Sequence, residues 1–236
     1  MQMIEQNFES QFDLPCKSHQ GRQAQAWLAQ LRQERAIAVI RSPDLALGSR
    51  MAQAVAAGGI HHIEITWNSD RPAHLVSQLR ETLPQCSIGA GTLLTEAQVK
   101  EAIAAGSQFL FTPHTQLDLI RCAVQADCPM VAGTLTPTEI VTAWQAGATA
   151  AKVFPIKAVG GAEYIRNLQG PLGQIPLIPT GGVTLDNAAE FLKAGAIAVG
   201  LSGQLFPRQA IDTENWDAIT EAAKTLRQRI GVVKDA

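Results

Sequence analysis

The sequence predicts an α/β fold: a (β/α)₈ barrel of the TIM type with an additional N-terminal helix. From residue 36 onward, short apolar runs alternate with segments of helical period, and the alternation occurs eight times at fairly even spacing. The chain has 236 residues, which nearly supplies the ~250 that such a barrel typically needs. An open doubly wound sheet is the alternative, but the G-x-G-x-x-G that usually follows its first strand is missing.

The apolar runs are short and closed by turn residues, which is typical of buried strands. We expect strands over residues 36–41, 60–66, 87–92, 108–113, 130–133, 149–154, 176–180 and 197–200. The segments between them have the period of helices, over residues 45–57, 73–83, 96–105, 117–125, 138–145, 162–168, 185–194 and 215–229.

Capping residues at the ends of these helices support their bounds. Several starts carry residues of the kind that cap free backbone N–H groups, namely the segments Ser42-Pro43-Asp44, Thr95-Glu96 and Thr136-Pro137-Thr138-Glu139. Several ends are followed by glycine, which ends a helix in the left-handed conformation without a steric penalty. These glycines are Gly58, Gly59, Gly106, Gly147 and Gly195.

The region before the first strand divides into two parts. Residues 1–20 are expected to form a loose N-terminal leader, and residues 21–236 a single barrel domain. Residues 21–35 predict the additional helix, because their apolar side chains fall on one face. These are Trp27, Leu28 and Leu31. We expect this helix to cover the lower end of the barrel.

Composition narrows the function classes. Lys and Arg total 19 and Asp and Glu total 21, a balance that suggests neither a nucleic-acid nor an anionic-membrane partner. The four cysteines have no zinc-ligand spacing, so reduced core thiols are expected. The N-terminus has no basic segment followed by an apolar one, and no apolar stretch is long enough to span a membrane. A cytoplasmic protein is therefore expected.

Lys152 is the most informative residue, because it lies inside the apolar run 150–155. Burial there disfavours the charged amine and raises the fraction present as neutral amine. A neutral amine in a dry pocket can attack a carbonyl to form a Schiff base. The alternative is a lysine at a strand end whose ammonium group reaches water.

Glu64 is the matching carboxyl, since it interrupts an apolar strand between Ile63 and Ile65. The carboxyl ends of the strands in such a barrel face one mouth, where Arg41, Glu64 and Lys152 are expected to gather. A buried carboxyl beside a cation can be tuned to pass protons near neutral pH. The alternative is an ion pair with Arg41 or Lys152 that only neutralises the barrel interior.

A phosphate cradle is expected at the ends of the last two strands. Gly181 and Gly182 precede a helix, and their backbone N–H groups together with the start of that helix suit a dianion. Ser202 and Gly203 would close the cradle, as strands 7 and 8 commonly do in barrels. The alternative is that the glycines only form tight turns.

His61 and His62 beside Glu64 superficially resemble a metal site. In a strand, however, His62 and Glu64 share a face while His61 points the opposite way. Core histidines are the better interpretation, and His114 is the one histidine expected at the mouth. A metal-dependent enzyme that uses Glu64 with His62 or His114 is kept as an alternative.

Ordered motifs over residues 36–206 resemble the pyruvate-dependent class I aldolases that cleave 2-keto-3-deoxy-6-phosphogluconate (KDPG) and 4-hydroxy-2-oxoglutarate (KHG). They are Ala38-Val39-Ile40-Arg41, Gly58-Gly59-Ile60, Ile63-Glu64-Ile65-Thr66, Gly89-Ala90-Gly91-Thr92, Thr112-Pro113, Lys152-Val153-Phe154-Pro155 and Pro179-Thr180-Gly181-Gly182-Val183. The resemblance implies a (β/α)₈ barrel assembled as a homotrimer, with no metal and no organic cofactor.

The resemblance also implies roles. Lys152 would be the Schiff-base lysine and Glu64 the general acid/base. Thr92 and the Pro113 backbone would hold the pyruvate carboxylate, and Phe154 would wall the pocket. Gly181, Gly182 and Ser202 would take the phosphate of a phosphorylated substrate. The products would be pyruvate and an aldehyde, either glyceraldehyde 3-phosphate or glyoxylate.

Two departures from the family pattern bear on the substrate. Many relatives carry arginine four residues after the glutamate, where this chain has Asn68, and Arg41 can supply the guanidinium instead. Leu201 and Gly203 flank Ser202 where relatives often have more glycine or a tryptophan. Weak phosphate binding would favour KHG, or decarboxylation of oxaloacetate through the same iminium. A barrel that binds a sugar phosphate without catalysis is a further alternative.

Overall fold

The computed structural model describes residues 21–231. The predicted leader at 1–20 and the last five residues of the predicted 21–236 domain lie outside the described residues, so both boundaries stay predictions. The strands are β1 (Ala36–Ile40), β2 (His62–Thr66), β3 (Ser87–Gly91), β4 (Leu110–Phe111), β5 (Met130–Thr134), β6 (Ala150–Val153), β7 (Leu177–Pro179) and β8 (Val199–Leu201).

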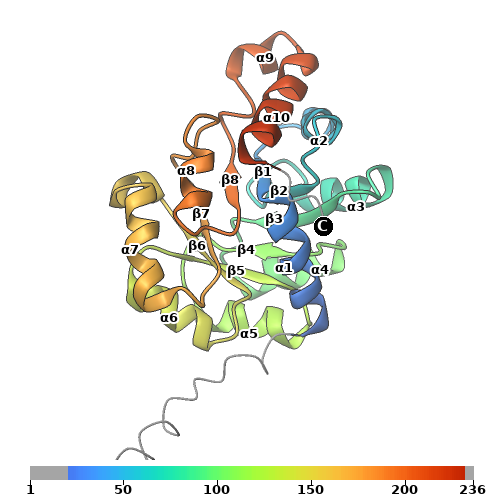
Figure 1. Ribbon diagram of the computed structural model, residues 1–236. Helices are drawn as coiled ribbons and strands as arrows, with labels where there is room; N and C mark the ends of the chain where they lie inside the picture. The colour runs from blue at the N-terminus through green and yellow to red at the C-terminus, as the bar shows by residue number, and fades with distance from the viewer. Residues whose placement is uncertain (1–20, 232–236) are drawn as a thin grey trace, which may run out of the picture.

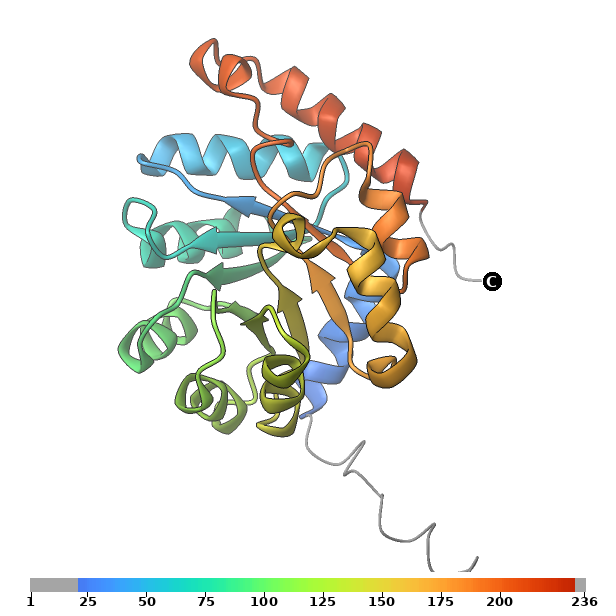
Figure 2. The ribbon, with the colours of Figure 1, turned by 90° about the vertical axis from the view of Figure 1, so that its left-hand side faces the viewer.

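These strands form one parallel sheet in the order β7-β6-β5-β4-β3-β2-β1-β8. A single bridge between Thr180 and Gly200, with a hydrogen bond of 3.1 Å from Ile197 N to Leu177 O, joins the two ends of the sheet. Figure 2 shows the strands at the centre with the helices around them. The (β/α)₈ barrel predicted from the sequence is confirmed.

The predicted helices are present with small shifts of their bounds (Figure 1). They are α2 (Leu45–Ala57), α3 (Pro72–Thr82), α4 (Glu96–Ala104), α5 (Leu117–Gln125), α6 (Pro137–Gln145), α7 (Ala162–Leu172), α8 (Ala188–Lys193) and α10 (Trp216–Ile230). Two short elements were not predicted, η2 (Ile156–Val159) and α9 (Arg208–Asp212). The predicted caps are confirmed, since Asp44, Thr95 and Thr136 each accept from a backbone N–H of the first turn.

The helix α8 is three residues shorter at its start than the sequence suggested. Thr184 and Asn187 form a reciprocal pair before it, because each backbone N–H donates to the other's side chain, at 2.7 and 3.1 Å. These bonds have the pattern of a capping box at a helix start. The residues between Thr184 and Ala188 form a turn that leads into α8.

The predicted additional helix is α1 (Arg22–Glu34), which covers the lower end of the barrel. Trp27 and Leu31 are buried in one apolar cluster with Phe109 and Phe111 of the barrel interior, and Leu28 packs at its edge. Each fully buried side chain of this size contributes on the order of 1.5–3 kcal/mol. A second, larger cluster fills the space between the strands and the outer helices. Among the described residues, no helix is both long and apolar enough to cross a membrane.

His62 belongs to the lower end of the barrel, and its ring packs against Trp27 and Phe109 at centroid distances of 5.9 and 6.1 Å. It is 2% exposed, and neither ring nitrogen has a hydrogen-bond partner among the described residues. Burial lowers the pKa of His62 from 6.5 to about 4, so the ring is neutral in the folded protein. The prediction of a core histidine is confirmed.

This burial predicts acid sensitivity. The unfolded chain takes up a proton on His62 near pH 6.5, whereas the folded chain does so only near pH 4. The contribution of His62 to the free energy of unfolding is therefore fully present above pH 6.5. It is lost as the pH drops from 6.5 toward 4, by about 3 kcal/mol in all. Urea unfolding across this range should show the slope, and His62→Phe should flatten it. His61→Gln, at the neighbouring half-exposed histidine, is the control. An equal slope in His62→Phe and wild type contradicts this account.

Candidate active site

A cavity of about 1030 Å³ opens at the carboxyl ends of the strands. All nine residues predicted as catalytic or substrate-binding line it: Arg41, Glu64, Thr92, Pro113, Lys152, Phe154, Gly181, Gly182 and Ser202. They come from seven strands or the loops that follow them, and the parallel barrel brings those ends to one mouth. The site residues predicted from the sequence therefore share one cavity.

Lys152 lies in β6, with its side chain inside the cavity and only 6% of the residue exposed. Its Nζ lies 5.5 Å from the ring centroid of Phe111 and 5.1 Å from that of Phe154. Within residues 21–231, no hydrogen bond or ion pair to this nitrogen is seen. The amine is therefore shielded by two aromatic rings and keeps its lone pair or protons free for a ligand.

Glu64 lies in β2, where it is 1% exposed and lines the same cavity. Burial raises the pKa of this carboxyl, while the positive charges of Lys152 and Arg41 act in the opposite direction. Its Oε1 has no hydrogen-bond partner, and neither cation forms an ion pair with it among the described residues. The alternative, an ion pair of Glu64 with Arg41 or Lys152, is therefore not formed among residues 21–231.

Two glycines leave space that neighbouring atoms of the site occupy. A Cβ on Gly91 would fall 1.8 Å from Oε1 of Glu64, so the carboxyl occupies the space that a side chain would fill. Gly133 pairs with Lys152 in the β5–β6 register, and a Cβ there would fall 2.2 Å from the Pro113 carbonyl carbon. The backbone after β4 can approach the Lys152 end of the barrel only because Gly133 has no side chain.

Thr92 follows β3 and has a φ of +59°. A β-branched residue rarely adopts this left-handed conformation, which costs on the order of 1–3 kcal/mol. Strained residues of this kind cluster at functional sites, where the surrounding structure holds them in place. The strain gives Thr92 a fixed position in the wall of the cavity.

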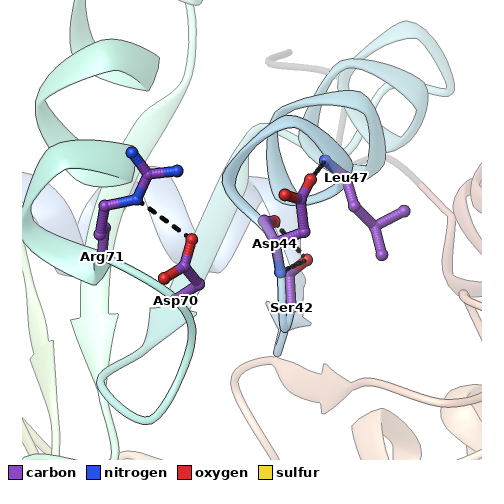
Figure 3. A network of polar contacts seen from close by, with 5 residues as sticks. All are labelled: Ser42, Asp44, Leu47, Asp70 and Arg71. Carbon is purple, nitrogen blue, oxygen red and sulfur yellow. Dashed lines mark hydrogen bonds and ion pairs between the residues drawn. The ribbon is translucent and has the colours of Figure 1, made fainter.

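Arg41 follows β1, and its Nε donates to Oδ1 of Asn68 over 3.1 Å. Asn68 stands where many members of the resembled family carry arginine. It contacts Arg41, whose guanidinium was suggested from the sequence to replace that arginine. The loops that carry the two residues are also joined, because Asp70 N donates to Ser42 O and Ser42 N donates to Ser69 Oγ. Figure 3 shows how Ser42 and Asp44 form the start of α2 beside Asp70 and Arg71 of the neighbouring loop.

The glycine turn after β7 lines the cavity. Gly181 and Gly182 have φ values of +78° and +114°. Asn187 Nδ2 donates to the carbonyl of Gly182 over 3.1 Å. Ser202, after β8, faces the same part of the cavity. The backbone of the turn and the hydroxyl group of Ser202 therefore line the same cavity, as the predicted cradle requires.

The histidines lie elsewhere. His62 is at the opposite end of the barrel from Glu64, and His114 is outside the cavity wall and contacts Gln116. In the part of the chain that the structure describes, no group of three or more His, Cys, Asp or Glu side chains could hold a metal ion. The ligand set of the alternative metal-dependent mechanism is therefore not assembled.

Sequence reasoning missed several residues of the outer cavity wall. Lys157 and Gly160 come from η2 and its end, Gly161 precedes α7, Asn187 precedes α8, and Glu190 lies in α8. The available signal was the sequence Lys157–Gly161 just before a predicted helix, because the N-terminal ends of helices after strands also face the mouth of a barrel.

The fold and the site define a (β/α)₈ barrel with a buried amine and a buried carboxyl at its mouth. The sequence model of the KDPG and KHG aldolase family matches residues 28–222. The chain belongs to this family of lyases. The 2-dehydro-3-deoxy-phosphogluconate aldolase of Haemophilus influenzae is 32% identical over 184 residues, covering 78% of this chain and 85% of that protein. The enzyme of the same name from Dickeya dadantii is 30% identical and covers 74% and 82%.

Solved structures agree. The KDPG aldolase of Legionella pneumophila, in which pyruvate was captured as a covalent carbinolamine intermediate, superposes with a TM-score of 0.78. It is 30% identical and covers 84% of this chain and 97% of that one. The KDPG aldolase of Zymomonas mobilis, 24% identical with a TM-score of 0.77, covers 84% of this chain and 94% of that one and supports the fold.

Proposed function

We propose that the protein is a class I aldolase that cleaves a 4-hydroxy-2-keto acid, KDPG or KHG, to pyruvate and an aldehyde. The observation that carries this proposal is the buried Lys152 amine in one cavity with the buried Glu64 carboxyl. The covalent carbinolamine described for the Legionella relative supports the same chemistry.

The reaction begins at Lys152. Its amine adds through the nitrogen lone pair to the C2 carbonyl to give a carbinolamine, and the Glu64 carboxyl donates the proton with which the carbinolamine hydroxyl leaves as water to form an iminium. The iminium carries a permanent positive charge close to Glu64, and a nearby positive charge favours the ionised carboxylate. Glu64, which has given up its proton and whose pKa burial otherwise raises, is therefore left as a carboxylate that can act as a base while the substrate is bound.

Bond cleavage follows from this pairing. The Glu64 carboxylate, directly or through water, takes the proton of the C4 hydroxyl, and the C3–C4 bond breaks. Its electron pair moves into the iminium to give an enamine, and C4 leaves as the aldehyde. The proton held by Glu64 then returns to C3, and water hydrolyses the iminium to release pyruvate and the Lys152 amine.

The remaining residues bind the substrate. Thr92 and the Pro113 backbone hold the pyruvate carboxylate at the strand ends, and Phe154 covers the pocket beside Nζ. Arg41, fixed by Asn68, offers its free guanidinium nitrogens to an anionic group. Gly181, Gly182 and Ser202 bind the distal phosphate of KDPG. The homotrimer and the cytoplasmic location stay predictions.

Chemical trapping tests the mechanism. The wild-type protein incubated with pyruvate and borohydride should gain the mass of one reduced pyruvate adduct, because the iminium is reduced to a stable amine. Peptide mass spectrometry should place the adduct on Lys152. Borohydride without pyruvate is the control. An unmodified Lys152, in a protein that still releases pyruvate from KDPG, refutes the Schiff-base mechanism.

A further inference from the structure

Lys157 is a charged residue in the cavity that the mechanism above does not use. It lies in η2 (Ile156–Val159), and its side chain is exposed in the outer wall. No hydrogen bond or ion pair of its ammonium group is seen within residues 21–231. The other charged groups of the cavity are Arg41, Glu64, Lys152 and Glu190.

The backbone of Lys157 is fixed against the glycine turn after β7. Ile156 N donates to Thr180 O over 2.9 Å, and Lys157 N donates to Gly181 O over 3.1 Å. A Cβ placed on Gly182 would fall 2.4 Å from Cβ of Lys157, so the stem of the lysine starts directly beside Gly182. The ammonium group is therefore within reach of any ligand held by the Gly181–Gly182 turn.

The surroundings of Lys157 favour an anion. Gly160 and Gly161 have open space where their side chains would be, and they lead into the start of α7, the positive end of that helix. Glu190 lies in the same wall and repels an anion. A dianion at this position therefore needs a cation that offsets Glu190, and Lys157 is the one whose backbone is joined to the turn.

We propose that Lys157 determines specificity by binding the distal phosphate, so that the protein prefers a 2-keto-3-deoxy acid that ends in a phosphate monoester to one that ends in a carboxylate. This inference rests on the proposed aldolase function. A phosphate monoester carries nearly two negative charges at neutral pH and three acceptor oxygens, whereas a carboxylate carries one charge and two oxygens. KDPG also extends further from C2 than KHG and so reaches the outer wall.

Steady-state kinetics of Lys157→Gln tests the proposal. With KDPG, kcat/KM should fall roughly 10- to 100-fold, mainly through KM, because a charge-assisted hydrogen bond is lost. With KHG, kcat/KM should change less than about twofold, because a carboxylate substrate does not depend on this contact. Inorganic phosphate should inhibit the wild type competitively and the variant much more weakly.

Two further variants separate a specific contact from a general charge effect. Lys193→Gln removes a lysine of α8 outside the cavity and should leave both substrates unchanged. Glu190→Gln removes the opposing charge in the cavity and should leave KM for KDPG equal or lower. If Lys157→Gln lowers kcat/KM equally for both substrates, or for neither, Lys157 does not determine specificity. A wild type that prefers KHG overturns the inference as well.

The failure of this inference is distinguishable from the failure of the proposed function. Pyruvate and borohydride report on Lys152 without involving a phosphate, so Lys157→Gln should still be trapped at the wild-type level. Absence of trapping in the wild type means that the Schiff-base proposal is wrong. Normal trapping with unchanged substrate preference means that only the role of Lys157 is wrong.

Discussion

Lys152→Ala should abolish the release of pyruvate from KDPG and KHG, with kcat reduced by a factor on the order of 10⁴ or more, the scale of loss when an active-site nucleophile is removed. The loss is this large because Lys152 supplies the electron sink that makes C3–C4 cleavage possible. A coupled assay for pyruvate measures it. The variant should also gain no mass with pyruvate and borohydride.

The matched control for this prediction is Lys157→Ala, which shortens a second lysine of the same cavity. It should still form the adduct on Lys152, because its role is limited to the distal end of the substrate. Circular dichroism and thermal unfolding of Lys152→Ala should remain cooperative, so that loss of activity is not loss of fold. Substantial turnover by folded Lys152→Ala would falsify the mechanism.

Glu64→Gln should lower kcat roughly 10²- to 10⁴-fold, the usual contribution of a general acid/base. It should still be trapped with pyruvate and borohydride, since the amine is intact. Single-turnover measurements should show that cleavage and protonation at C3 are slow while adduct formation remains. Wild-type kcat in Glu64→Gln contradicts the assignment of Glu64 as the proton carrier.

The stability of Glu64→Gln provides its control. Because the pKa of Glu64 is raised in the fold, the folded state holds the proton to higher pH than the unfolded state does. Titration of Glu64 therefore lowers the free energy of unfolding as the pH rises above 4.5, the ordinary pKa of the carboxyl. Glutamine does not titrate, so the variant should be at least as stable as the wild type at neutral pH, and its lost activity cannot be attributed to unfolding.

Gly91→Ala offers a second route to the same defect. The new Cβ must displace the Glu64 carboxyl, which is the movable end of a side chain, so the fold should survive while the carboxyl leaves its position. The variant should therefore resemble Glu64→Gln, with slow proton transfer and intact trapping on Lys152.

The barrel and its inner site were predictable because both follow from local patterns. Apolar runs and capped helices repeat along the chain, and a parallel barrel brings every strand end to one mouth. Lys152 and Glu64 could be identified because each is a charged residue within an apolar strand. No distance between them was needed.

The segment 157–161 could have been placed near the mouth because it precedes a predicted helix, but the contacts of the outer wall could not be predicted. The position of Lys157 depends on hydrogen bonds to Thr180 and Gly181, more than twenty residues away, and nothing near Lys157 in the sequence indicates them. The contact between Arg41 and Asn68 likewise joins two loops. Short elements such as η2 and α9 have too few residues for a periodic signal and are set by their neighbours.

The narrow closure of the sheet has a consequence for how a ligand acts on the whole barrel. Within the part of the chain that the structure describes, the backbone pairing of the β7 edge with the β8 edge consists of the Thr180–Gly200 bridge and the Ile197–Leu177 hydrogen bond, and the turns that follow these two strands line the cavity. A phosphate bound by Gly182 and Ser202 together would link the loops after β7 and β8. Substrate binding would then stabilise the closure of the barrel between these two strands.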